Sequence, residues 1–313
     1  MRTPPSADTL RHNLEEALDL LKDYAPEPLP QARLVEPLPS LLEQCETLCA
    51  ALPETEPLRS VHHMACTGGT LLSKCLAVMP NVTLLSEIDP LSTFILPKRH
   101  EARRFAPSDV IYGARTALRP IDDATAEAVF AASIEALHGA LCAQGQRLVL
   151  RDHAHSQFCT DTDFAQRPTL REMLARRQPV LSVVTVRHPL DSFLSLHANG
   201  WRNFAPFTIE EYARRYAAFL ARHDRIRVWR YEDFLDDPDG VLEQICAALD
   251  LPFVAGAEDL LSLVSLSGDS GRSANRIGRR KRREVPEEIR REAAQSAAYA
   301  ELCDTLGYAP ETG

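Results

Sequence analysis

The sequence predicts an α/β protein in which helices cover both faces of a parallel sheet. From residue 58 onward, short apolar segments with strand-like composition alternate with longer segments of helical periodicity, a pattern typical of parallel sheets. The segment 180–186 is almost continuously apolar, as expected of a central strand that is buried on both faces. With 313 residues, the chain is long enough for one large α/β domain and an extension.

A helical N-terminal extension is predicted over residues 1–57. Apolar residues recur with helical spacing over 8–24 and over about 38–52, and prolines separate and end these two segments. We therefore expect two parts, an extension over 1–57 and an α/β domain over 58–313. The extension either covers the core of the domain or contacts a partner, and covering the core is the simpler role.

The elements of the α/β domain follow from the same patterns. Strands are expected at about 60–65, 82–86, 146–151, 180–186 and 226–231. Helices are expected at about 70–79, 125–144, 168–177, 190–198, 208–223 and 238–249. Residues 252–313 are expected to be helical with one polar break at 267–275. Because ligands of such sheets bind beyond the carboxyl ends of the strands, residues that follow the strands are the candidates for function.

Composition excludes several classes of partner and location. The formal net charge of −9 gives no general attraction to nucleic acid or to an anionic membrane. The eight cysteines form no C-x-x-C pair, which favours a reduced, cytoplasmic protein. The sequence contains no apolar window of about 18 residues, so we expect neither a signal peptide nor a membrane anchor.

A glycine turn follows the first predicted strand of the domain, in the segment Cys66-Thr-Gly-Gly-Thr-Leu-Leu72. Glycine lets the backbone turn tightly and approach an anion, and N–H groups at the start of a helix can hold phosphate or sulfate. Thr70, not a lysine, directly follows the second glycine, so the segment lacks the Walker A pattern of ATP-binding proteins. Such turns are also common without a ligand, so this segment alone does not define a site.

A second anion site is predicted in Val184-Thr-Val-Arg-His-Pro-Leu-Asp-Ser-Phe-Leu-Ser195. Arg187 ends a strand, and Pro189 and Asp191 both suit the first turn of a helix. Ser195 lies about two turns into that helix, close enough to share an anion with Arg187. Together with the glycine turn, this segment predicts a ligand that carries two phosphate-like groups.

The two segments, in this order, resemble sulfotransferases that use 3′-phosphoadenosine 5′-phosphosulfate (PAPS), and the resemblance extends over about 61–283. It implies a sulfotransferase fold related to that of P-loop NTPases, and in-line transfer of a sulfuryl group to a hydroxyl or amine. It also implies which residues hold the nucleotide. The 5′-phosphosulfate would lie on Thr67, Gly68, Gly69, Thr70 and Leu71, and the 3′-phosphate on Arg187 and Ser195.

Two later segments carry the same resemblance. The segment 228–238 contains Tyr231, which the resemblance implies as a contact on the adenosine side. The segment 267–283 resembles the basic loop with which these enzymes close over the nucleotide, and its candidates are Arg272, Ser273, Arg279 and Arg280. A basic run is otherwise a solvated surface or a site that binds nucleic acid. The negative net charge of the whole chain argues against nucleic acid.

Three residues after strands are predicted to be catalytic. Arg151 would stabilise the charge of the transferred group, and either Arg151 or Lys74 can replace the lysine or arginine that the family carries where this chain has Cys66. A general base must remove the proton of the acceptor. The resemblance offers Glu87 after the second strand and His153 after the third, and it favours Glu87 slightly.

No metal is expected from the sequence. His153 and His155 form an H-x-H pair, but no further ligands follow at a standard spacing. His62 and His63 lie in a predicted strand, where neighbouring side chains point to opposite faces.

The sequence does not identify the acceptor, and it leaves two alternative functions open. Residues at about 90–124, 154–178 and 199–210 are expected to line the acceptor side, since loops carry specificity, and they suit a sugar, a peptide side chain or a small alcohol. A nucleoside or small-molecule kinase on a related fold is one alternative function. A protein that binds the nucleotide without catalysis is the other, and the oligomeric state is not predicted.

Overall fold

The computed structural model describes residues 56–97, 108–267, 277–279 and 282–310, with single positions before them at 15, 16, 19, 40, 43 and 44. The chain separates into two compact units, Met1–Glu54 and Thr55–Gly313. Apart from the single positions, the predicted helices at 8–24 and 38–52 lie outside the described residues. The extension over 1–57 and its role therefore stay a prediction.

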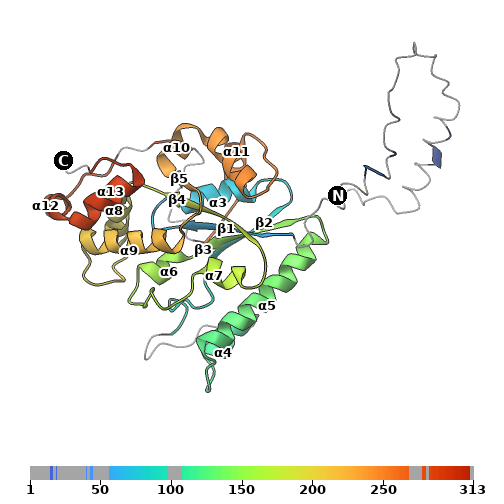
Figure 1. Ribbon diagram of the computed structural model, residues 1–313, viewed down its shortest axis with the longest axis horizontal. Helices are drawn as coiled ribbons and strands as arrows, with labels where there is room; N and C mark the ends of the chain where they lie inside the picture. The colour runs from blue at the N-terminus through green and yellow to red at the C-terminus, as the bar shows by residue number, and fades with distance from the viewer. Residues whose placement is uncertain are drawn as a thin grey trace, which may run out of the picture. The chain divides into compact units, whose positions relative to one another are not determined.

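In the described part of the second unit, the central feature is a five-stranded sheet (Figure 1). Its strands are β1 (Leu58–His63), β2 (Val82–Ile88), β3 (Arg147–Asp152), β4 (Val180–Val186) and β5 (Val228–Arg230), in the order β2-β3-β1-β4-β5. All neighbouring strands are parallel. The predicted α/β fold on a parallel sheet is thus confirmed, and each predicted strand is present.

Helices connect the strands and cover both faces of the sheet (Figure 1). The predicted helices of the domain are present as α3 (Gly69–Ala77), α5 (Asp123–Cys142), α7 (Leu170–Ala175), α8 (Pro189–Asn199), α9 (Ile209–Arg222) and α11 (Pro238–Ala248). The sequence did not reveal the short helices α4 (Val110–Arg115), α6 (Ala154–Phe158) and α10 (Tyr231–Asp236). Helices of one or two turns are too short for a periodic pattern to identify them.

The C-terminal region is less helical than predicted. It contains a 3-10 helix, η1 (Ala257–Leu263), and two α-helices, α12 (Glu287–Gln295) and α13 (Ala297–Leu306). The described residues 264–267, 277–279 and 282–286 form no helix. The basic residues within the last two of these ranges offer no apolar face whose burial could stabilise one. Within the described residues, no helix has both the length and the apolar character needed to span a bilayer.

Side-chain alternation in β1 divides the core into two sides. All residues of β1 are buried. Val61 packs in one apolar cluster with Leu72 and Leu76 of α3, whereas Leu58 packs in another with Phe130 and Ile134 of α5. Successive side chains of a strand point to opposite faces, so β1 presents neighbouring residues to two different environments.

Arg59 fastens β1 to the end of α11 from within the core. Its side chain is fully buried, and it donates hydrogen bonds to the carbonyl oxygens of Leu249 at 2.6 Å and Pro57 at 2.9 Å. Its guanidinium also forms ion pairs with Glu56 at 2.6 Å and Asp250 at 3.2 Å. Removing a buried cation that satisfies several acceptors leaves those acceptors without partners, which is costly.

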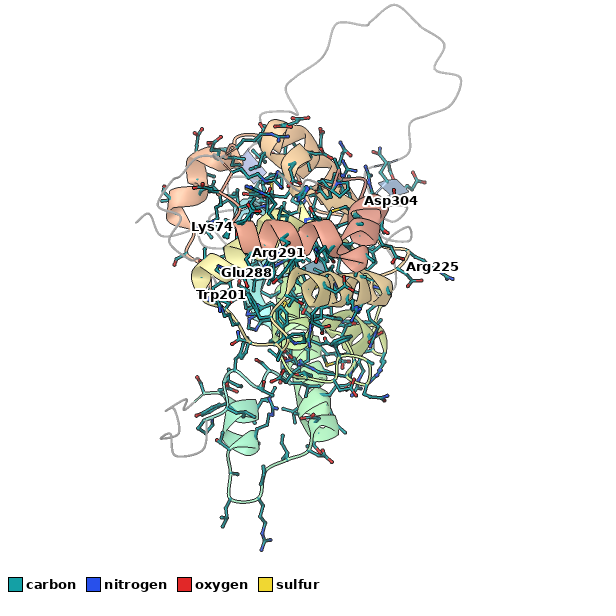
Figure 2. The ribbon with its side chains drawn as sticks, turned by 90° about the vertical axis from the view of Figure 1, so that its left-hand side faces the viewer. Lys74, Trp201, Arg225, Glu288, Arg291 and Asp304 are labelled. Atoms are coloured by element: carbon teal, nitrogen blue, oxygen red, sulfur yellow. The ribbon has the colours of Figure 1, made fainter. Side chains whose placement is uncertain are left out.

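We therefore expect Arg59→Met to lower the free energy of unfolding by about 2–4 kcal/mol, measured by urea denaturation. The matched control is Arg225→Ala, since the Arg225 side chain is 93% exposed and projects from the surface (Figure 2). The control should change stability by less than about 0.5 kcal/mol. Equal effects of the two substitutions would show that Arg59 does not join these elements.

Candidate active site

The glycine turn between β1 and α3 has the backbone geometry of an anion site. Cys66 and Gly68 both have left-handed backbones, with φ of 61° and 88°, and no side chain caps the start of α3. The Thr67 hydroxyl donates to the Met64 carbonyl at 2.7 Å, and the Leu71 N–H donates to the Gly68 carbonyl at 3.0 Å. The turn is therefore braced from within, while the first N–H groups of α3 have the geometry that binds anions.

Two aromatic rings pack so closely on the turn that any larger residue in place of its glycines would force the rings or the backbone to move. A Cβ atom on Gly68 would lie 2.3 Å from the ring of Tyr231, the first residue of α10. A Cβ atom on Gly69 would lie 2.1 Å from the ring of His63 at the end of β1. Both contacts are shorter than van der Waals packing permits, so the two glycines allow the backbone to lie against an aromatic wall.

Arg151, the next-to-last residue of β3, brings a positive charge to the start of α3. Its Nε donates to Nε2 of His63 at 2.9 Å, and its Nη2 donates to the Thr70 hydroxyl at 2.9 Å. Its Nη1 donates to the Ser86 hydroxyl at 2.7 Å and to the Ser267 carbonyl at 2.9 Å. The guanidinium thus supplies a cation beside the turn, where Cys66 carries none.

His63 orients Arg151, and this role was not predicted. The His63 Nδ1 lies 3.1 Å from the Met64 carbonyl, so Nδ1 carries the proton and Nε2 is free to accept from Arg151. Burial, with the positive charge of Arg151, keeps the pKa of His63 well below its usual value. The imidazole is therefore neutral. Strand alternation could have identified His63, because it places this side chain on the face of the sheet that α3 covers.

Glu87 lies at an irregularity of β2 that turns it toward Arg151. The pairing of β2 with β3 shifts register between Leu85 and Ile88, and Glu87 has a left-handed backbone with φ of 56°. Its Oε1 is 3.6 Å from Nη2 of Arg151. Bulges redirect side chains, and a non-glycine residue at positive φ costs energy that the surrounding structure must offset.

His153 is the N-cap residue of α6 and belongs to an aromatic cluster. Its ring centroid is 4.2 Å from that of His155 and 5.9 Å from that of Phe94. His155 stacks on Trp201 with centroids 5.8 Å apart and planes at 7°. Burial lowers the pKa of His153 to about 4 and that of His155 to about 3, so both imidazoles are neutral at physiological pH.

Arg187 reaches the glycine turn from β4. Its Nη1 donates to the Cys66 carbonyl at 3.2 Å and to the Ser195 hydroxyl at 3.5 Å. The guanidinium carbon lies 5.6 Å from the centroid of the Tyr231 ring, which also packs on the turn. The Ser195 hydroxyl itself donates to the Asp191 carbonyl at 2.9 Å. The structure therefore brings the two predicted anion-binding segments together around Tyr231.

The late basic segment is only partly described. Arg279 forms two hydrogen bonds to the Asp236 carboxylate, at 2.6 and 2.5 Å. Arg282, which the sequence did not single out, donates to the Asp191 carboxylate in the first turn of α8 at 2.6 Å. The basic run itself was the only signal for Arg282. The other candidates of this segment, Arg272, Ser273 and Arg280, lie outside the described residues.

Known proteins resemble the chain in sequence and in fold. A family model described as the sulfotransferase family matches residues 61–255. The sulfotransferase domain of a Synechococcus olefin synthase is 18% identical, with a TM-score of 0.50, and the match covers 82% of this chain and 98% of that domain. No curated protein matches the chain.

Two further solved structures are more distant. The sulfotransferase domain of the curacin biosynthetic pathway is 17% identical with a TM-score of 0.45, over 82% of this chain and 99% of that domain. A mouse sulfotransferase in complex with PAP is 12% identical with a TM-score of 0.41, over 80% of this chain and 86% of that protein. At 18% identity, the likeness to the olefin synthase domain bears on the fold alone.

The family match runs from β1 through α11 and extends beyond it, and it includes the glycine turn, Arg151 and Arg187. It covers more than half of the 313 residues. The predicted resemblance is thereby confirmed: this chain belongs to the sulfotransferase family.

Proposed function

We propose that the protein transfers the sulfuryl group of PAPS to a hydroxyl or amine of an acceptor. The observation that carries this proposal is the pair of guanidiniums at one glycine turn. Arg151 donates to Thr70 at the start of α3, and Arg187 donates to the Cys66 carbonyl. A nucleotide with anionic groups at two positions matches two such cations better than a ligand with a single anion.

The residues around the turn suggest how the nucleotide lies. The first N–H groups of α3 and the Thr70 hydroxyl would bind the 5′-phosphosulfate. Arg187 and Ser195 would bind the 3′-phosphate, and Tyr231 between them and the turn would contact the nucleoside. Thr67 would act indirectly, because its hydroxyl proton is used inside the turn.

Arg151 would stabilise the negative charge that develops during the transfer. In an in-line displacement, the acceptor oxygen or nitrogen bonds to sulfur as the bond from sulfur to the 5′-phosphate oxygen breaks, and negative charge grows on that oxygen. A cation fixed in advance stabilises this charge without reorganising. Arg151 is nearly fully buried and fixed by His63, so its charge compensates for the family's basic residue that this chain replaces with Cys66.

Glu87 is the base that the geometry supports best. The bulge and the left-handed backbone turn its carboxylate to the guanidinium that would hold the sulfate. A base there is close to the attacking group and can take its proton. His153 instead packs against His155 and Phe94, and we propose that this aromatic cluster, with Trp201, lines the acceptor side.

The observations support the two alternative functions, a kinase and a non-catalytic nucleotide-binding protein, less well than they support sulfuryl transfer. The sulfotransferase family match and the lack of a Walker lysine both favour sulfuryl transfer over phosphoryl transfer from ATP. The replacement at Cys66 supported a non-catalytic role, but Arg151 provides the charge that this replacement removed. A cytoplasmic location is part of this proposal and rests on the sequence, in which the eight cysteines form no C-x-x-C pair.

Calorimetry with 3′,5′-adenosine bisphosphate and 5′-AMP tests the nucleotide site. The 3′-phosphate should add about 1–3 kcal/mol, which is roughly 5- to 150-fold in Kd. Arg187→Ala should remove most of this preference, whereas Arg225→Ala, at an exposed site, should keep it. Equal affinity of the wild-type protein for the two nucleotides would refute the proposal.

A second expectation concerns the close packing of Gly68 on Tyr231. Gly68→Ala adds a methyl group at a left-handed position against the ring, so it should weaken binding of the bisphosphate at least about tenfold. Gly139→Ala is the control, because a Cβ atom there meets nothing within 4 Å and alanine favours the helix. Unchanged binding by Gly68→Ala would mean that the turn does not contact the nucleotide.

Single-turnover release of 3′,5′-adenosine bisphosphate from PAPS, with a panel of hydroxyl and amine acceptors, tests the base. Glu87→Gln should slow transfer by about 10²- to 10⁴-fold while nucleotide affinity changes little. His153→Gln should mainly raise the KM for the acceptor. The reverse pattern would assign the base to His153, and tight binding without transfer by the wild-type protein would support the non-catalytic alternative.

A further inference from the structure

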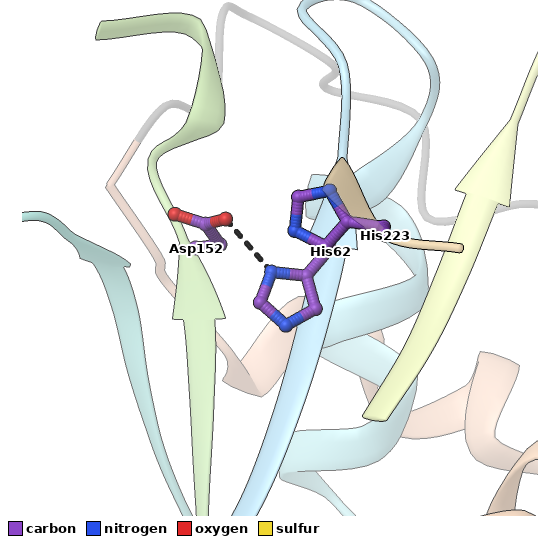
Figure 3. A group of neighbouring side chains, drawn as sticks. All are labelled: His62, Asp152 and His223. Carbon is purple, nitrogen blue, oxygen red and sulfur yellow. Dashed lines mark hydrogen bonds and ion pairs between the residues drawn. The ribbon is translucent and has the colours of Figure 1, made fainter. Parts of the chain in front are cut away.

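A second polar cluster lies on the face of β1 that points away from the glycine turn (Figure 3). It consists of His62 from β1, Asp152 from β3 and His223 at the end of α9. All three are buried, with exposed fractions of 0%, 5% and 2%. Three side chains that commonly bind metals thus converge inside the protein from elements far apart in the sequence.

The atoms that could bind an ion lie close together. The His62 Nδ1 is 2.7 Å from Oδ2 of Asp152, and the rings of His62 and His223 have centroids 4.5 Å apart with planes tilted by 42°. One ligand atom from each of the three residues lies within 4.8 Å of the others. Ligand atoms held at about 2.0–2.1 Å around tetrahedral zinc are roughly 3.3 Å apart. Modest side-chain movements would therefore bring the three ligand atoms to the spacing that zinc requires.

Each imidazole is held by a second partner at its other nitrogen. The His62 Nε2 lies 2.9 Å from the Ser60 hydroxyl, which lies 2.8 Å from the Ser182 hydroxyl. The His223 Nδ1 lies 2.8 Å from the Phe219 carbonyl, an acceptor that fixes the proton on Nδ1. Histidines that bind metals usually donate their other N–H in this way.

The second nitrogen of His223 lacks a hydrogen-bond partner. Its Nε2 is buried and has none within the described residues, although its lone pair faces the cluster once Nδ1 carries the proton. A buried polar atom without a partner is costly, and an ion that accepts this lone pair would remove that cost.

The ligand atoms narrow the choice of ion. A hard ion such as Mg²⁺ or Ca²⁺ needs several oxygen ligands, whereas this cluster offers a single carboxylate. Two imidazoles and one carboxylate match the ligand preference of zinc and similar divalent ions.

We propose that His62, Asp152 and His223 bind one divalent transition-metal ion, with Zn²⁺ as the best match, and that the ion joins β1, β3 and the end of α9. The role is structural, because the cluster is buried and faces away from the glycine turn. The ion would also hold Asp152, which lies between Arg151 and His153 in the chain.

The test is the metal content of the full-length protein. After equilibration with Zn²⁺ and desalting, mass spectrometry should find about one ion per chain, and Co²⁺ in its place should give the strong visible absorption of tetrahedral coordination. Removing the ion with a chelator should lower the Tm, and Zn²⁺ should restore it. These measurements use the wild-type protein, so they do not depend on whether a variant folds.

Two substitutions then locate the site. His223→Gln should reduce the bound zinc at least about tenfold, whereas His138→Gln, which replaces another buried histidine that lies outside the cluster, should retain it. Wild-type protein that retains less than about a tenth of an equivalent would overturn the proposal. So would zinc that His223→Gln binds as well as the wild-type protein does.

Discussion

The site depends on the position of β1 between β3 and β4. The three strands are parallel, and Val61 of β1 is in register with Arg151 while His63 is in register with Thr185. Parallel strands end at the same edge of the sheet, so the residues after β1 and β4 and the end of β3 must meet there. The glycine turn thus lies between Arg151 and Arg187 for a topological reason. No local feature of either segment could bring about this meeting alone.

The positive charge beside the glycine turn comes from a neighbouring strand. Cys66 brings no charge to the turn, and Arg151 contributes a guanidinium from β3. A buried cation is costly unless it is hydrogen-bonded on all sides. Arg151 meets this condition through a neutral imidazole, two hydroxyls and a carbonyl, none of which cancels its charge. The Glu87 carboxylate, 3.6 Å away, offsets part of that charge.

The sequence predicted features that depend on local patterns. The strands were found from their apolar composition, and Arg187 and Ser195 from their spacing along a strand and a helix. The register shift that turns Glu87 toward Arg151 left no such signal, since a bulge depends on the neighbouring strand. The pairing of Arg279 with Asp236 was equally hidden, because it joins residues that are distant in sequence. A metal was not expected from the sequence, since His62, Asp152 and His223 have no standard ligand spacing.

The two polar regions of the domain share the same pair of strands. His62 and His63 are neighbours in β1, and Arg151 and Asp152 are neighbours in β3. Alternation sends His63 and Arg151 to the side of the glycine turn, where they contact each other, and His62 and Asp152 to the opposite side, where they also contact each other. Both contacts require the same register of β1 against β3, since a shift by one residue would exchange the faces. The buried pair therefore stabilises the register on which the position of Arg151 depends, whether or not an ion binds.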